Sequence, residues 1–146
     1  LRYTVTNPGT KGAGSTVSPA SMKGKIWLLE FWSTRCGACI RFIPLVKLIH
    51  GQQGKLGLEI VAVARDTAAR LSTFLAHTPL PYTVALDATG AAIQAYDIEP
   101  IPAFVLIDAQ GMVRDVAVGR TWPQDLQRII ALTNKLLNVK PLPATP

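Results

Sequence analysis

The sequence predicts an α/β sandwich in which helices flank a mixed β-sheet. Segments typical of strands and helices alternate over residues 26–96. Residues 103–118 then resemble an antiparallel hairpin, and residues 121–136 resemble a closing helix. Of the 146 residues, 49% are hydrophobic and 16% are charged, which is typical of a globular domain with its own core and excludes a disordered chain.

The first core strand is predicted at residues 26–32, which are apolar enough to be buried on both faces of the sheet. Lys23-Gly24-Lys25 predicts a turn before it. The mixture of Thr, Ser, Gly and Pro further upstream predicts irregular structure, with a short edge strand at residues 2–5. We therefore divide the chain into an N-terminal segment, a domain and a proline-rich tail, at residues 1–22, 23–138 and 139–146.

A helix is predicted from residue 36 to about residue 50. Apolar residues recur there at helical spacing, namely Phe42, Ile43, Val46 and Ile49. Pro44 should kink this helix, since it lacks an N–H group and crowds the preceding turn. Gly51 and Gly54 should end it.

The rest of the domain continues the alternation. Further strands are predicted at residues 58–64, 82–86, 103–107 and 112–118. Asp66 is expected to cap the helix that follows the first of these strands, and the segment from Asp87 to Gly90 should open a short helix that reaches about Tyr96. A capping box from Thr121 to Gln124 predicts the start of the last helix.

The net charge of +6 would suit an anionic partner, but the lysines and arginines are scattered, without basic runs or interleaved aromatic residues. Binding of nucleic acid is therefore not expected. No apolar stretch approaches the ~20 residues of a membrane-spanning helix. Because the chain begins at Leu1 and not at methionine, we expect a mature or truncated form, with room for a leader or membrane anchor before it.

Two cysteines, Cys36 and Cys39, are the only ones in the chain, and they lie where a predicted strand leads into a helix. Unsatisfied N–H groups and the positive end of the helix dipole favour a thiolate at that position. A second thiol one turn along can attack a mixed disulfide made by the first. The pair therefore predicts a redox-active dithiol.

Three other interpretations of the pair are weaker. A zinc site needs four ligands, and only His50 and His77 remain, without ligand-like spacing, so no metal site is expected. Ile40 follows the pair where attachment of c-type haem requires histidine. A purely structural disulfide would close a very short loop and would restrict the unfolded chain little.

The chain carries several short motifs in a fixed order, namely Lys23-Gly-Lys25, Phe31-Trp32, Cys36-Gly-Ala-Cys39, Pro44, Asp87-Ala-Thr-Gly90 and Tyr96-Asp-Ile-Glu-Pro-Ile-Pro102-Ala-Phe-Val-Leu-Ile-Asp108. Taken together, these motifs resemble those of the TlpA/ResA group of bacterial thiol–disulfide oxidoreductases. The resemblance covers roughly residues 20–137. It implies a thioredoxin-like three-layer sandwich with a mixed sheet flanked by helices. It also implies that Asp87-Ala-Thr-Gly90 belongs to an inserted strand–helix segment that plain thioredoxin lacks.

The resemblance also implies roles for individual residues. Cys36 would be the exposed nucleophile and Cys39 the buried resolving thiol. Pro102 would be the cis-proline beside the sulfur atoms, where an ordinary trans proline is the alternative. The backbone of Ile101 would then bind an extended substrate segment in the manner of an added β-strand.

Glu30 interrupts an apolar strand where thioredoxins carry a buried aspartate behind the resolving cysteine. A desolvated carboxylate there should have a raised pKa and could accept the proton of Cys39, whereas the alternative is a carboxylate at a wet edge. The TlpA/ResA relatives often place a glutamate three residues after the second cysteine, where this chain has Phe42.

Other residues around the pair are expected to contact the substrate. Arg35 replaces the usual tryptophan and adds a cation that should favour the thiolate and anionic partner surfaces. Ala38 replaces the common proline of C-G-P-C, so the direction of electron flow does not follow from the motif. Trp32 and Gly37 complete this set of expected substrate-binding residues.

The expected function is thiol–disulfide exchange with protein disulfides, more as a reductant than as a disulfide oxidase or isomerase. The dithiol carries the electrons itself, so no cofactor is expected. Expected partners are protein substrates and a membrane or soluble thiol donor, with the protein acting as a monomer. The resemblance implies a periplasmic or other extracytoplasmic bacterial location and a part in cytochrome c biogenesis, with a cytoplasmic location as the alternative. Two other interpretations remain open, a Cu(I)-handling protein and a non-catalytic binding module with permanently oxidised cysteines.

Overall fold

A computed structural model describes residues 3–5, 15–119 and 124–138. Its centre is a seven-stranded sheet with the order β2-β1-β5-β4-β3-β6-β7. The strands are β1 (Tyr3–Val5), β2 (Thr16–Val17), β3 (Ile26–Trp32), β4 (Leu58–Ala64), β5 (Thr83–Leu86), β6 (Ala103–Ile107) and β7 (Val113–Val118). The central strand β3 pairs in parallel with β4 and antiparallel with β6, so the sheet is mixed, as predicted.

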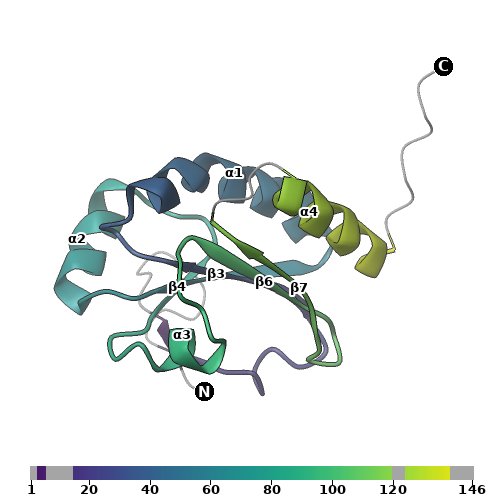
Figure 1. Cartoon of the computed structure of the whole chain (residues 1–146), viewed down its shortest axis with the longest axis horizontal. Coiled ribbons are helices and arrows are strands. Elements are labelled where there is room, and N and C mark those ends of the chain that lie inside the picture. Colours follow the sequence, from purple (N-terminus) through teal and green to yellow (C-terminus); the bar gives the residue numbers. More distant parts are fainter. Residues whose placement is uncertain (1–2, 6–14, 120–123, 139–146) are drawn as a thin grey trace.

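The helices cover both faces of this sheet, unequally (Figure 1). They are α1 (Gly37–Gln53), α2 (Ala68–His77), α3 (Ala91–Ala95) and α4 (Gln124–Leu136), with a short 3₁₀ turn, η1 (Gly54–Leu56), after α1. Helices α1, α2 and α4 lie over one face, and α3 lies over the other. No helix within the described part of the chain is both long and apolar enough to cross a membrane.

Each face of the sheet has its own apolar core, and β3 contributes to both. Leu28 and Trp32 belong to the core under α1, α2 and α4, whereas Leu29 and Phe31 belong to the core on the α3 side. This alternation follows from the two-residue period of a strand. It places Glu30, between Leu28 and Trp32, on the face that α1 covers.

Three predicted strands match β3, β4 and β6 residue for residue, and the predicted hairpin is the antiparallel pair of β6 and β7. The segment expected to form a strand and a short helix forms β5 and α3. Its assignment as the insertion typical of TlpA-like proteins stays a prediction. The N-terminal strand β1 pairs with both β2 and β5, so β2 forms the edge of the sheet in place of the predicted edge strand.

Of the two glycines predicted to end the first helix, Gly54 is confirmed as the C-cap of α1, whereas Gly51 does not end the helix. Gly51 lies inside α1, which continues to Gln53. Gln53 is buried, and its Nε2 donates hydrogen bonds to Ile130 O at 3.3 Å and to Asn134 Oδ1 at 2.7 Å, so contacts with α4 stabilise this last turn. A glycine inside a helix costs only about 1 kcal/mol, which such contacts can offset. Pro44 also lies within α1, and the expected kink stays a prediction.

The predicted cap of α2 is also wrong. Thr67, not Asp66, is the N-cap, and its side chain accepts a hydrogen bond from Arg70 N at 3.3 Å. Asp66 is instead used by the loop before Cys36, a tertiary contact that the local sequence does not reveal. The predicted capping box at Thr121 and the proline-rich tail lie outside the described residues.

A candidate redox site at the start of helix α1

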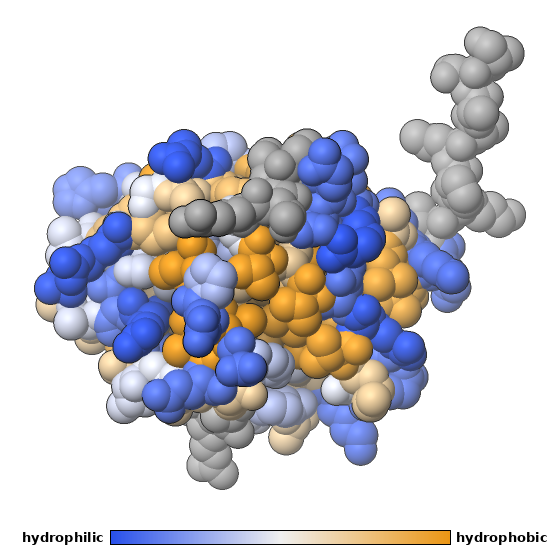
Figure 2. All heavy atoms as spheres, in the orientation of Figure 1, coloured by the Kyte–Doolittle hydropathy of each residue, from blue (hydrophilic) through white to orange (hydrophobic). Residues whose placement is uncertain are grey.

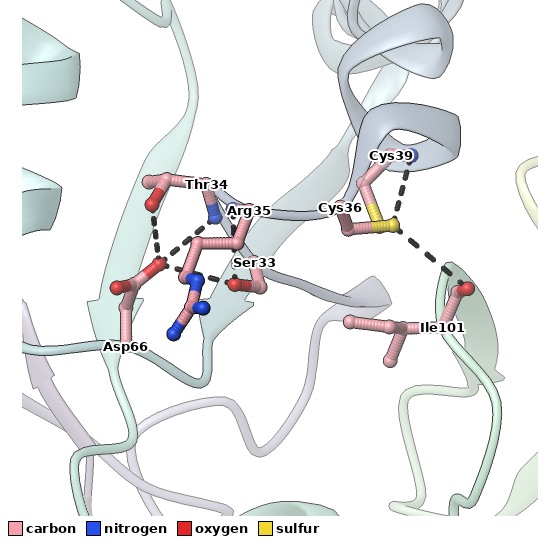
Figure 3. Close-up of a disulfide and its surroundings, with 7 residues drawn as sticks. All are labelled: Ser33, Thr34, Arg35, Cys36, Cys39, Asp66 and Ile101. Carbon is pink, nitrogen blue, oxygen red and sulfur yellow. Dashed lines mark hydrogen bonds between the residues drawn. A yellow bond between two sulfur atoms is a disulfide. The ribbon is translucent and has the colours of Figure 1, made fainter.

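Cys36 and Cys39 form a disulfide at the junction between β3 and α1 (Figure 3). Cys36 is the N-cap residue of α1, and Cys39 lies in the first turn of that helix, with their Cα atoms 5.2 Å apart. The two sulfur atoms differ in access, because Cys36 is partly exposed and Cys39 is completely buried. An attacking partner can therefore reach Cys36 but not Cys39.

The start of α1 is arranged to stabilise negative charge on Cys36. The backbone N–H of Cys39 donates to Cys36 Sγ at 3.1 Å, which is the contact of a side-chain N-cap. After reduction, the same N–H group and the positive end of the helix dipole would favour the thiolate. The redox dithiol predicted from the sequence thus has a matching local geometry.

The loop before β6 lies directly beside Cys36. The Ile101–Pro102 peptide bond is cis, and Ile101 O lies 3.9 Å from Cys36 Sγ (Figure 3). Pro102 is buried, whereas Ile101 is partly exposed. The structure therefore brings the predicted Pro102 and Ile101 to the predicted nucleophile across 65 residues of sequence.

Gly119 supports this loop and was not identified from the sequence. Its backbone N–H donates to Pro102 O at 2.6 Å, and a Cβ atom at Gly119 would lie only 2.9 Å from the same oxygen. Only glycine fits this approach without a shift of the Pro102 backbone. The signal in the sequence is a glycine directly after the second hairpin strand, whose partner strand starts next to Pro102.

Asp66 anchors the loop that leads into Cys36 (Figure 3). Its carboxylate accepts hydrogen bonds from Thr34 N at 2.9 Å, Thr34 Oγ1 at 2.6 Å, Ser33 Oγ at 3.2 Å and Thr67 N at 3.0 Å. Burial alone would raise the pKa of Asp66, but these hydrogen bonds outweigh it and lower the pKa below its ordinary value. The ionised carboxylate therefore connects the end of β4 to the approach to Cys36.

Glu30 is buried on the face of β3 that α1 covers, and only 2% of its surface is exposed. The alternative interpretation, in which Glu30 is exposed to solvent at an edge, is therefore wrong. Loss of hydration raises the pKa of Glu30 to about 8. Burial also raises the pKa of Tyr82, and the Glu30 carboxylate adds to this effect, so the two side chains interact. Glu30 and Cys39 lie on the same covered side of the sheet.

The remaining predicted site residues fall into two groups. Arg35 and Gly37 are exposed, and Ala38 is partly exposed, so all three lie at the surface around Cys36. Trp32 is only 1% exposed and packs edge-on against Phe74, with ring centroids 5.4 Å apart. This burial corrects the expectation that Trp32 contacts the substrate, because its ring is covered.

Two further observations concern possible metal ligands and the position of Phe42. Among the residues that the structure describes, no group of three or more His, Cys, Asp or Glu side chains is placed to hold a metal ion. Phe42, at the position of the glutamate of TlpA/ResA relatives, packs against Phe104 with ring centroids 5.8 Å apart. Glu30, Asp87 and Asp108 are the buried carboxylates among the described residues, and Glu30 lies in β3 on the face that α1 covers.

Comparison with known proteins finds a matching family and similar sequences. The model of the AhpC/TSA family matches residues 4–116. The thiol-disulfide oxidoreductase ResA of Halalkalibacterium halodurans is 28% identical over 120 residues, which cover 82% of this chain and 68% of that protein. The chain thus spans about two thirds of the length of the curated ResA relatives that it matches.

Solved structures show the same fold. A protein described as a thiol:disulfide interchange protein DsbE, from Chlorobium tepidum, superimposes with a TM-score of 0.79 and 26% identity, over 94% of this chain and 92% of that chain. A protein described as a thioredoxin, from Neisseria meningitidis, gives a TM-score of 0.73 and 28% identity, over 84% and 83% of the two chains. These similarities confirm the predicted thioredoxin-like fold and the resemblance to ResA proteins.

Proposed function

The chain belongs to the AhpC/TSA family and is a thiol–disulfide oxidoreductase, and from this premise we propose that it reduces disulfides of other proteins. The observation that carries the proposal is the asymmetry of the Cys36–Cys39 disulfide at the start of α1. One sulfur atom is accessible and helix-capped, and the other is buried. This is the arrangement needed for a nucleophile and a resolving thiol.

In the proposed reaction, the reduced protein attacks first through the Cys36 thiolate. A new S–S bond forms between Cys36 and one substrate sulfur, and the other substrate sulfur leaves as a thiolate that takes a proton. Cys39 then loses its proton and attacks Cys36 Sγ, which expels the second substrate thiolate. Two electrons pass from the dithiol to the substrate, and the Cys36–Cys39 disulfide returns to the form seen here.

Two neighbouring groups support these steps. Glu30 is proposed to accept the proton of Cys39, because a carboxylate with a pKa of about 8 is a competent base near neutral pH. Ile101, beside Cys36 Sγ, is proposed to hold an extended substrate segment through its backbone, with Pro102 keeping the loop in place. Gly37 and Ala38 are proposed to border this contact at the surface.

We further propose a location outside the bacterial cytoplasm, with the periplasm first, a part in cytochrome c biogenesis, and a thiol donor that returns the dithiol to its reduced state. These proposals rest on the resemblance to the TlpA/ResA group. The direction of electron flow is proposed on the same basis. A reduction potential of about −270 mV would support a reductant, and a value of about −120 mV would mean that the protein forms disulfides.

The direct test of the mechanism is to trap its intermediate. With Cys39→Ser, the attack by Cys36 should still occur but resolution should not, so mixed disulfides with substrate proteins should accumulate. With Cys36→Ser, no such adducts should form, because Cys39 is buried. Non-reducing electrophoresis after incubation with a disulfide-bonded model protein measures both variants. Equal adduct formation by the two variants, or none by either, would contradict the proposed roles.

A further inference from the structure

A hollow of about 400 Å³ lies on the surface next to the redox site. It extends from Arg35, which precedes Cys36, to Ile101, whose carbonyl lies 3.9 Å from Cys36 Sγ. Figure 3 shows the Arg35 and Ile101 side chains on the same side of the loop that leads to Cys36. The far wall includes Arg65, which directly follows β4, and Arg70, which lies in the first turn of α2. We name the hollow and its three arginines the arginine groove.

The cations of the arginine groove are available to a ligand. Arg35 and Arg65 are exposed, and neither forms an ion pair with any residue that the structure describes. By contrast, Arg114 of β7 and Arg128 of α4 form ion pairs with aspartates. Cations outside the groove, such as Lys47 and Lys55, also form no ion pair with a described residue, and hydrophilic side chains are spread over the face shown in Figure 2. What distinguishes the groove is that its three arginines line one hollow beside the redox site.

Asp66, the one carboxylate among the residues that line the groove, already accepts hydrogen bonds from neighbouring residues. Asp66 is almost completely covered and accepts four hydrogen bonds from Ser33, Thr34 and Thr67. Its nearest contact with Arg70 is long, at 3.9 Å, and the Arg70 side chain is 53% exposed. Asp66 therefore neutralises the groove only weakly.

The position of Arg65 is supported by a glycine. A Cβ atom at Gly90 would lie 3.3 Å from Arg65 Nε, so the guanidinium stem passes closely over this residue. Gly90 has a φ angle of +76°, in the left-handed region that favours glycine.

A further cation outside the groove lies near Cys36. The Arg41 guanidinium, on α1, lies 3.7 Å from the position that a Cβ atom would take at Gly37, the residue after Cys36.

The loop before Pro102 carries the opposite charge on its other side. There, Asp97 and Glu99 line a separate hollow together with Val116 and Val118 of β7. A segment that lies across Ile101 would thus meet cations on its α2 side and carboxylates on its β7 side. Such an arrangement selects substrates by the order of their charges.

We propose that the arginine groove binds acidic side chains of the substrate protein that flank its reactive cysteine. The inference rests on the proposed function, since it assigns the substrate class of the same site. An extended segment held at Ile101 places its neighbouring residues over the groove, where aspartate or glutamate would pair with Arg35, Arg65 and Arg70. Exposed charges of this kind act mainly on the rate of encounter and on specificity.

The test uses the reduced protein and three synthetic peptides, each with one cysteine in a mixed disulfide with thiopyridine. The residues flanking the cysteine are glutamate, glutamine or lysine, and stopped-flow absorbance gives the second-order rate constant. The decisive quantity is the rate with the glutamate peptide divided by that with the glutamine peptide. Comparing this ratio between protein variants cancels both the intrinsic reactivity of each peptide and any change in the nucleophilicity of Cys36.

The wild-type ratio is expected to be about fivefold at about 20 mM salt and to approach one at about 0.5 M salt, since exposed charges are screened. The Arg65→Gln/Arg70→Gln variant should lose most of this preference. Lys55→Gln removes the same charge in η1, beyond the far end of α1, and should keep the wild-type ratio. The single variant Arg65→Gln should give an intermediate ratio.

The possible outcomes distinguish a failure of the arginine-groove proposal from a failure of the proposed function. Equal rates with glutamate and glutamine peptides would overturn the arginine groove, while reduction of the glutamine peptide would still support the oxidoreductase mechanism. A preference that survives in the double variant, or that falls equally in Lys55→Gln, would also overturn it. Failure to reduce any of the peptides would refute the proposed function and the inference together.

Discussion

Replacing Glu30 by glutamine should stabilise the oxidised protein, and the gain should grow with pH. The folded protein raises the pKa of Glu30 from its ordinary value of 4.5 to about 8, because the carboxylate loses its hydration. The folded state therefore binds the proton more tightly than the unfolded state. Stability linked to this proton is fully present below about pH 4.5 and is lost as the pH rises, until it is gone above about pH 8.

The size of the effect follows from this interval. Each pH unit between the two values costs about 1.4 kcal/mol of unfolding free energy. The penalty is thus about 1 kcal/mol at pH 5, about 3 kcal/mol at pH 7 and about 5 kcal/mol at pH 9. Glu30→Gln keeps the shape of the side chain and removes the charge, so it should remove this dependence on pH.

Urea denaturation of the oxidised protein at pH 5, 7 and 9 measures the prediction. The matched control is Glu59→Gln, the same change at a surface residue of β4 that pairs with Lys25 at 3.2 Å. This control should shift the unfolding free energy by less than about 1 kcal/mol at every pH. If the difference between Glu30→Gln and wild type did not grow from pH 5 to pH 9, the argument from burial would be wrong.

Two further predictions concern the supports of the site. Gly119→Ala should destabilise the protein by about 1–3 kcal/mol in urea, because the new methyl group meets Pro102 O at 2.9 Å, whereas Gly51→Ala in α1 meets nothing within 4 Å and should stabilise it by about 0.5–1 kcal/mol; shifts of the same sign would contradict this reasoning. Asp66→Asn should cost about 1–2 kcal/mol at pH 7, because the hydrogen bonds from Thr34 lose their charged acceptor. Since the pKa of Asp66 is lowered, its stabilising effect is present above the ordinary pKa and is lost as the pH falls through the lowered value; a cost that persists in strong acid would refute this account.

Features written in short stretches of sequence are predictable for this protein. The strands β3, β4 and β6 are mostly apolar runs bounded by turn residues, so both their type and their limits follow from local pattern. Glu30 stands out because it lies in the middle of the β3 run, and the structure shows that it is buried. The disulfide pair is predictable because the strand, the turn and the helix start are adjacent in sequence.

Features that depend on distant contacts are not predictable in this way. Asp66 is a residue type and position typical of a helix N-cap, but its carboxylate accepts hydrogen bonds from Thr34, which lies 32 residues away in the sequence. Gly51 is a residue type that often ends a helix, but the contacts of Gln53 with α4 extend α1 beyond Gly51. The arginine groove belongs to the same class, since Arg35 and Arg65 are brought together by the parallel pairing of β3 and β4.

Glu30 shows how the fold and the reaction make opposite demands on one side chain. Its burial costs stability at neutral pH, yet the same burial gives it a pKa of about 8, which suits a base for Cys39. Glu30→Gln should therefore make the protein more stable and slow the resolution of a Cys36 mixed disulfide by about 10²-fold, the usual effect of losing a general base. Stopped-flow release of the bound thiol measures this rate. A variant that is more stable and resolves as fast as wild type would show that Glu30 affects only folding.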